Sequence, residues 1–150
     1  MISRIHTAIV LSIAAGAAFW LLFLRSTVPT DLSYLSTPTG TTIEVSVADT
    51  PSTRARGLSG TDPLPFGTGK LFIFDTPDRY GFWMKDMHYP LDIIWIDSAW
   101  RVVEITYSAL PESYPTTFVP AVPVQYVLEL HAGDPSVQSL PVGTELTFAR

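Results

Sequence analysis

Residues 91–107 read LDIIWIDSAWRVVEITY and contain two strand-like runs on either side of a short turn. The first run, residues 91–96, is short and apolar apart from Asp92, a pattern typical of a β-strand. Asp97 and Ser98 favour a turn, and residues 101–107 form the second run. This stretch therefore predicts two neighbouring strands, and the rest of the fold is worked out from them.

Further strands are expected on both sides of this pair. Residues 42–47 alternate polar and apolar side chains, which indicates a half-buried strand. The same alternation in residues 80–85 places Phe82 and Met84 on one face, with Trp83 and Lys85 on the other. The remaining strands are expected at residues 71–74, 124–130 and 145–148.

Few helices are expected. Thr50 followed by Pro51 is typical of a helix start, and Gly57 favours its end just after Arg56. Asp134 followed by proline resembles a second helix cap, whereas four prolines predict a long loop or an extended edge at residues 108–123. The sequence thus predicts a mainly β fold, a compact β-sandwich or jelly-roll-like barrel with one or two short helices.

An apolar run near the N-terminus predicts a membrane anchor. Residues 7–24 are 18 consecutive residues without a charge, which as a helix would reach about 27 Å, close to the ~30 Å hydrocarbon core of a bilayer. Ala15-Gly16-Ala17 could instead serve as a signal-peptide cleavage site. Because the run continues through residues 19–24, we favour a retained transmembrane anchor.

The chain is therefore divided into three parts. Residues 1–25 are expected to be the anchor, residues 26–40 a linker rich in Ser, Thr and Pro, and residues 41–150 the β domain. Arg4 and Arg25 flank the span almost symmetrically, so the positive-inside rule gives little preference for either orientation. A short N-terminal anchor before a C-terminal domain favours a single-pass protein whose domain is extracytoplasmic.

Composition excludes several classes of function. The chain has no cysteine, so disulfides, thiolate catalysis and cysteine-bound metals are excluded. Its net charge is −5 and it has no basic stripe, which argues against nucleic-acid binding. Beyond the anchor flank the chain has only two histidines, His88 and His131, so neither a metal site nor a cofactor is expected.

Several segments together resemble the DUF192 family, a domain of unknown function. The resemblance spans residues 43–148, and its most specific part is Phe82-Trp83-Met84-Lys85 followed by Pro90-Leu91-Asp92. It implies a compact, mainly β fold of sandwich or jelly-roll type, often behind an N-terminal signal or anchor. It implies no established reaction, cofactor or partner. The other matching segments are residues 56–58, 69–74, 93–97 and 126–133.

The chain departs from the family pattern at four places. Ser59-Gly60 stand where Met-x-Arg is usual, and Lys70 stands where the family has Met. Asp86-Met87 replace Asn-Thr, and His131 replaces Asn. If the family's missing Arg and Asn line a site, that site is altered in this protein.

Six residues are candidates for a ligand-binding site. Lys85 and Asp92 end two apolar strands, so they either border a polar pocket beside Trp83 or form a structural ion pair. Arg56 could reach a carboxylate of the protein or of a ligand, or simply lie in solvent at a helix end. Glu129 and His131 share one face of a strand, where they could act in acid–base chemistry.

Three functions follow from these observations. We favour a membrane-tethered, extracytoplasmic domain that binds a small ligand or serves as an accessory module. The second is an envelope hydrolase that uses Asp92, Glu129 and His131, although no catalytic residues are identified. The third is an assembly partner for an envelope protein, contacted through the proline-rich loop at residues 108–123.

Overall fold

The structure, a computed structural model, describes residues 32–150. The predicted anchor at residues 1–25 and the first part of the predicted linker lie outside the described residues. Within residues 32–150, no helix combines the length and apolar character needed to cross a membrane.

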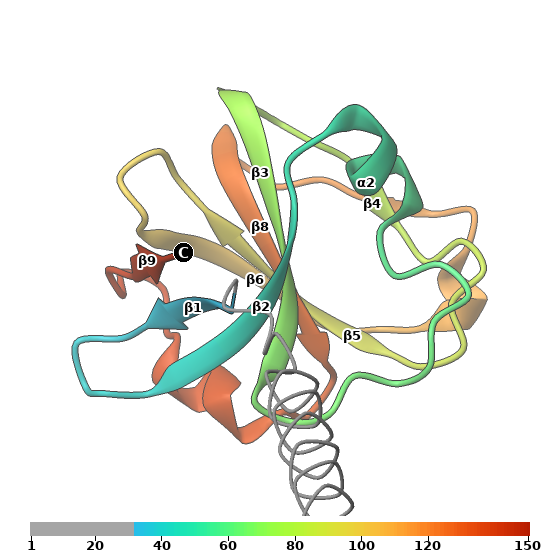
Figure 1. The fold of residues 1–150 in the computed structure, drawn as a ribbon. Helices are drawn as coiled ribbons and strands as arrows, with labels where there is room; N and C mark the ends of the chain where they lie inside the picture. Colours follow the sequence, from blue (N-terminus) through green and yellow to red (C-terminus); the bar gives the residue numbers. More distant parts are fainter. Residues whose placement is uncertain (1–31) are drawn as a thin grey trace, which may run out of the picture. The chain divides into compact units, whose positions relative to one another are not determined.

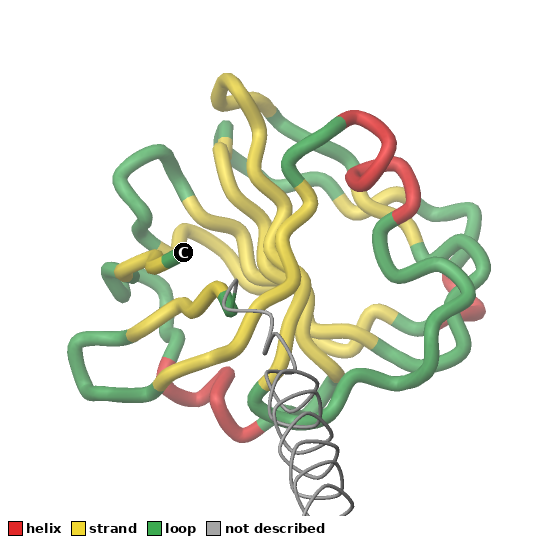
Figure 2. The backbone as a smooth tube through the Cα atoms, in the orientation of Figure 1, coloured by secondary structure: helices red, strands yellow, loops and turns green. Residues whose placement is uncertain are grey.

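The described part is mainly β, as the sequence predicted, and its helical segments are short and lie at the periphery of the strands (Figure 2). The strands are β1 (Ser33–Ser36), β2 (Thr42–Ala48), β3 (Thr68–Asp78), β4 (Phe82–Trp83), β5 (Leu91–Ile96), β6 (Val102–Ala109), β7 (Thr117–Phe118), β8 (Val124–His131) and β9 (Thr147–Ala149). The helical segments are the α-helix α2 (Pro51–Arg56) and the 3-10 helices η1 (Pro111–Ser113) and η2 (Pro135–Ser139).

Seven of these strands form one mixed sheet (Figure 1). Its order is β6-β5-β8-β3-β2-β1-β9, with β2 and β3 parallel and the other neighbours antiparallel. Strands β4 and β7 pair separately as a small two-stranded sheet. The sequence predicted two layered sheets or a jelly-roll barrel, and one large sheet is found instead.

The large sheet is buried on both faces because each face has its own apolar core. All six residues of β5 are buried, and they alternate between the two cores: Ile93 and Trp95 lie in the first, Ile94 and Ile96 in the second. The first core is completed by the segments around α2, β4 and β7, and the second by β1, η2 and the chain before β9. Short segments therefore cover the faces that a second sheet would cover in a sandwich.

The sheet also curls far enough to bring its two edges together. Arg101, just before β6, forms an isolated β-bridge with Glu145, just before β9. Backbone hydrogen bonds of 2.8–2.9 Å join the same two segments, including that from the Val102 amide to the Thr144 carbonyl.

The predicted boundary between the linker and the β domain lies too far toward the C-terminus. Residues 33–36, assigned to the linker, form β1, which pairs with both β2 and β9. Leu35 is buried in the second core, so the folded unit includes residues from 32 onward rather than from 41. Alternation of buried and partly buried side chains over only four residues was too short a pattern to stand out among serines and threonines.

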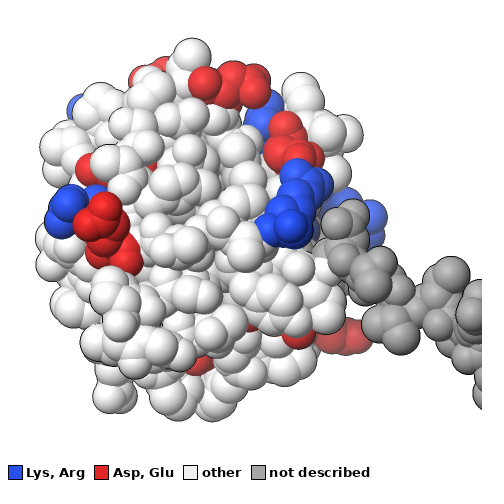
Figure 3. All heavy atoms as spheres, turned by 60° about the vertical axis from the view of Figure 1, so that its left-hand side comes forward, with Lys and Arg blue, Asp and Glu red and all other residues white. Residues whose placement is uncertain are grey.

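Other local predictions are largely confirmed. Thr50 caps α2: its hydroxyl accepts a hydrogen bond from the Thr53 amide, and the Thr53 hydroxyl accepts one from the Thr50 amide. Phe82 is buried and Trp83 exposed, as the alternation predicted, although the strand they form is only two residues long. Figure 3 shows the face reached by turning the left side of Figure 1 forward, where charged side chains lie mainly around a broad uncharged area.

Candidate functional site

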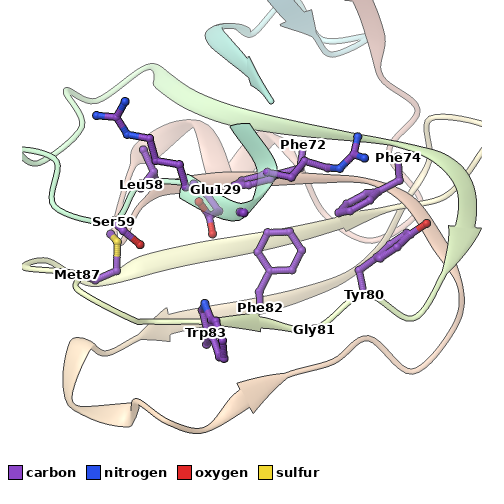
Figure 4. Close-up of a pocket in the computed structure, with 14 residues that line it drawn as sticks. Leu58, Ser59, Phe72, Phe74, Tyr80, Gly81, Phe82, Trp83, Met87 and Glu129 are labelled. Atoms are coloured by element: carbon purple, nitrogen blue, oxygen red, sulfur yellow. The ribbon is translucent and has the colours of Figure 1, made fainter. Parts of the chain in front are cut away.

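A cavity of about 180 Å³ lies beneath α2, on the face of the sheet that carries the first core. Figure 4 shows that its lining comes from α2 and the turn after it, from β3 and β8, and from the segment that contains β4. The lining residues are Arg54, Ala55, Arg56, Gly57, Leu58, Ser59, Phe72, Phe74, Tyr80, Gly81, Phe82, Trp83, Met87 and Glu129.

Helix α2 supplies two arginines to the cavity. Its start is fixed by the Thr50 cap, and it ends at Gly57, whose φ of 52° is unfavourable for residues with a Cβ. A Cβ at that position would be 3.5 Å from the Phe72 ring, so the helix end packs directly on the aromatic wall. The last turn therefore presents Arg54 and Arg56 at the cavity.

Arg54 is held by the backbone rather than by an acid. Its Nη1 donates hydrogen bonds to the carbonyls of Asp49, at 2.7 Å, and Ile73, at 2.8 Å. The guanidinium carbon lies 5.2 Å from the centroid of the Phe74 ring, within cation–π distance. Because no carboxylate pairs with it in the described part of the chain, its positive charge is available to the cavity.

Aromatic rings form most of the cavity wall. The Phe82 ring packs edge-on against Phe72 at a centroid distance of 4.8 Å and against Trp95 at 5.4 Å. Phe74 stacks on Tyr80 at 3.5 Å. These mutual contacts fix the rings in place, so the wall is a preformed apolar surface.

Glu129 adds a buried carboxyl group to the cavity. It lies on β8, is 5% exposed, and its carboxyl projects from the sheet toward the space bounded by Phe82 and Trp83 (Figure 4). No group in residues 32–150 makes a hydrogen bond with its Oε2. Burial of a carboxyl oxygen without a hydrogen-bond partner is energetically unfavourable, so Glu129 is a candidate for binding a ligand.

Burial also changes the ionisation of Glu129. Removal from water raises its pKa to about 8, and the positive charge of Lys70 opposes that rise without cancelling it. At pH 7 the side chain is therefore mainly a neutral carboxylic acid that can both donate and accept a hydrogen bond. The cavity consequently combines a neutral acid with two positively charged arginines.

Comparison with known proteins places this fold and cavity in a family. Residues 34–148 match the family described as DUF192, Uncharacterized ACR. The chain belongs to the DUF192 family.

Two solved structures resemble this DUF192 chain. One is a candidate transcription regulator from Sinorhizobium meliloti 1021, with 32% sequence identity and a TM-score of 0.69 over 77% of this chain and 91% of that one. The other is a protein of unknown function from Novosphingobium aromaticivorans DSM 12444, with 27% identity and a TM-score of 0.69 over 77% and 83%. No protein with a curated function matches the chain.

Three of the six predicted site residues lie together in this DUF192 domain. Arg56, Trp83 and Glu129 all line the cavity. Trp83 is 55% exposed and packs edge-on against Tyr114 of the proline-rich loop, with 6.0 Å between ring centroids. The structure therefore brings an arginine, an indole and a carboxyl from three distant sequence positions to one site.

Lys85 and Asp92 do not belong to this site. Asp92 is buried and uses both carboxylate oxygens for backbone amides, that of Ser108 at 2.8 Å and that of Gly133 at 3.1 Å. The two ion pairs of residues 32–150 are Arg101–Glu145 and Arg150–Asp49, so Lys85 and Asp92 form neither the predicted polar cluster nor an ion pair. Asp92 thus connects the end of β6 to the turn that follows β8.

The predicted hydrolase set is also not assembled. Cross-strand pairing puts Glu129 beside Ile93 and His131 beside Leu91, on the face of the first core. Asp92 pairs with Leu130 and therefore points to the opposite face. His131 stacks on Tyr89 at 5.5 Å, and its Nδ1 is 2.9 Å from the Ala132 carbonyl. The three side chains consequently have no common reaction space.

Sequence reasoning missed most of the cavity lining. Phe72, Phe74, Tyr80 and Arg54 were not among the predicted site residues. Two departures from the DUF192 pattern lie at or beside the cavity and could have indicated its position. Lys70 is the cross-strand neighbour of Glu129, and Met87 lines the cavity. A cation at a position that is usually Met indicated a polar neighbour on the facing strand.

Proposed function

We propose that this DUF192 domain binds a small ligand in the cavity beneath α2. The observation that carries the proposal is the Glu129 carboxyl, buried inside an aromatic cavity with an oxygen that lacks a hydrogen-bond partner in the described residues. Concave, largely apolar sites with a few convergent polar groups are typical of small-molecule binding. A ligand that hydrogen-bonds to Glu129 would satisfy this group and gain affinity from doing so.

The proposed setting is the outer side of a membrane. The support is the uncharged run at residues 7–24 together with the short segment before β1. A single-pass anchor would keep the binding domain close to the membrane surface, where it would act as an accessory module for envelope processes. This part of the proposal concerns location and does not depend on the ligand.

The binding proposal is tested by isolating the full chain from native membranes in a mild detergent and measuring its mass without denaturation. We expect a fraction of the protein to carry an additional small mass that is released on unfolding. In Ser59→Phe, which puts a ring into the cavity, that mass should be lost. The matched control is Ser98→Phe in an exposed turn, which should retain it. Equal retention by both variants would contradict binding in this cavity.

A second candidate function is docking to an envelope protein through residues 108–123. Four apolar residues of this loop are 43–52% exposed, namely Leu110, Tyr114, Val119 and Val122. Exposed apolar groups that lie together favour protein contact. Phe118, in contrast, packs against the first core and is only partly exposed. Photo-crosslinking from position 122 in intact cells, with position 98 as the control, tests this function.

A further inference from the structure

We propose that the ligand is a single-ring carboxylate, whose ring contacts Phe82 and Trp83 and whose carboxylate accepts a hydrogen bond from Glu129. This inference rests on the proposed function and names the chemical class of its ligand. It is carried by the size of the cavity, by the charges of the groups around it, and by the position of the Glu129 carboxyl across the cavity from Phe82.

The size of the cavity limits the ligand to one ring with a small substituent. Its volume is about 180 Å³. An engineered apolar cavity of roughly 150 Å³ in another protein binds benzene, so this cavity fits a six-membered ring and one carboxylate-sized group. A nucleotide, a fused-ring cofactor or a lipid with a long chain would have to extend out of it into solvent.

The charges around the cavity favour an anion. Arg54 and Arg56 line it, and neither forms an ion pair within residues 32–150. Lys70 lies close enough to both Arg56 and Glu129 to interact with their charges. Since Glu129 is mainly neutral at pH 7, the net charge at the site is positive. Arginine, in particular, suits carboxylate recognition.

The Glu129 carboxyl lies across the cavity from the Phe82 ring. In Figure 4 the Glu129 carboxyl points from β8 toward the interior, and the ring of Phe82 faces it from the segment that contains β4. Trp83, which is 55% exposed, lines the cavity at its outer side. A flat ring can therefore contact the aromatic side while its substituent reaches the carboxyl. A neutral carboxylic acid donates a strong, charge-assisted hydrogen bond to a carboxylate, which would use the unpartnered end of Glu129.

Ionisation of Glu129 should oppose this binding. Lys70 on the neighbouring strand β3 favours the ionised form of Glu129, and the charge of Glu129 adds to the rise in the pKa of Tyr89, which burial mainly causes. Arg54 and Arg56 line the same cavity, and His131 lies on the same face of β8. Once Glu129 loses its proton, it can no longer donate to the ligand and it repels the ligand's carboxylate. Affinity should therefore fall as the pH rises through about 8.

The test uses benzoate, benzamide and benzylammonium as probes of the same ring with different charges. The ¹⁵N-labelled full chain in nonionic detergent is titrated with each probe at pH 7, and the indole N–H signal of Trp83 is followed, assigned with Trp83→Phe. Because these probes have about nine heavy atoms, we expect dissociation constants of order 0.1–10 mM, which NMR can measure. Benzoate should bind at least about tenfold more tightly than benzamide, and benzylammonium should not bind.

Two variants connect the binding to the named residues. Arg56→Gln should weaken benzoate binding by about five- to tenfold, whereas Arg101→Gln, on an exposed arginine outside this cavity, should leave it unchanged. Glu129→Gln keeps a hydrogen-bond donor, so it should still bind benzoate but lose the decrease in affinity between pH 7 and pH 9. Unfolding midpoints of all variants, measured in parallel, establish that each is folded.

The outcomes separate this inference from the proposed function. If benzamide or benzylammonium shifts the Trp83 signal as strongly as benzoate, the carboxylate assignment is wrong while binding of small ligands in the cavity stands. If no probe shifts that signal and the native protein carries no additional mass, both proposals are wrong. A pH-independent affinity for benzoate in the wild-type protein would overturn the role given to Glu129.

Discussion

Lys70 and Glu129 are direct cross-strand partners on β3 and β8, yet their charged groups do not form an ion pair. Lys70 is half-buried, whereas Glu129 is almost completely buried. Burial lowers the pKa of Lys70, an effect to which Arg56 adds, while Glu129 raises it. For Glu129, burial outweighs the attraction of Lys70, so the carboxyl is kept in its neutral form near pH 7.

This arrangement predicts that the folded protein becomes less stable as the pH rises from about 4.5 to about 8. Between the ordinary value of 4.5 and the folded value of about 8, the unfolded chain has released the Glu129 proton and the folded chain has kept it. Raising the pH therefore favours unfolding, with a slope of up to about 1.4 kcal/mol per pH unit from this one group. Urea unfolding of the full chain in detergent at pH 5–8.5 measures the slope.

Glu129→Gln is the control for this prediction, because glutamine does not titrate. The difference in unfolding free energy between wild type and variant should change steadily over that pH range and level off above about pH 8. A constant difference across the range would show that burial does not hold the carboxyl neutral.

Asp92 and Lys85 should contribute to stability independently and unequally. Asp92→Ala leaves the amides of Ser108 and Gly133 without their acceptor, which should cost about 2–4 kcal/mol of unfolding free energy. Lys85→Ala removes an exposed side chain and should change stability by less than about 0.5 kcal/mol. The double variant should equal the sum of the single ones, and a coupling above about 1 kcal/mol would reveal an ion pair in solution.

Gly69 should be intolerant of even one added methyl group. A Cβ there would lie 2.7 Å from Leu130 Cδ2 and 2.9 Å from the Glu129 carbonyl oxygen, so β3 and β8 would have to separate. We expect Gly69→Ala to lower the unfolding free energy by about 1–3 kcal/mol. The comparison is Gly40→Ala, where φ is +90° but nothing lies within 4 Å, and whose effect should be about 1 kcal/mol. Equal effects would mean that β8 moves aside easily.

Membrane anchoring predicts a specific pattern of proteolysis. If residues 7–24 span the membrane with the domain outside, protease added to intact cells should remove the domain and leave a short membrane-bound fragment. Detection with tags at both ends distinguishes the two products. If the domain is cleaved only after the cells are lysed, it faces the cytoplasm and the proposed orientation is wrong. If a high-salt wash releases the intact protein from the membrane, residues 7–24 do not span it.

The strands could largely be predicted because their patterns are local. Residues 91–96, 101–107 and 124–130 correspond closely to β5, β6 and β8, since an apolar or alternating run indicates a strand wherever that strand lies. The order in which the strands pair could not be predicted from local patterns. A parallel pairing of β2 with β3 and the insertion of β8 between β5 and β3 depend on contacts between distant segments, so a single sequence does not reveal one curled sheet.

The site was harder to predict than the fold for a related reason. Asp92 and Glu129 look alike in sequence, each an acid within an apolar strand. Their difference arises from the partners that tertiary structure provides: two backbone amides for Asp92, and none for Glu129 Oε2 within the described residues. Even so, Glu129 and Trp83 were predicted, because a charge in a strand and an alternating indole were visible from the pattern alone. Arg56 was predicted because a guanidinium at a helix end could reach a carboxylate.

The alternation of β8 between the two cores also bears on how the chain finds its correct pairing. Glu129 faces the cavity, and its neighbours Leu128 and Leu130 face the aliphatic second core. If β8 slipped by one residue against β3 and β5, Glu129 would enter that aliphatic core and a leucine would enter the cavity. The misaligned state would hold an acid with no polar neighbour, which penalises it strongly. A residue placed for binding would in this way also act as a register marker during folding.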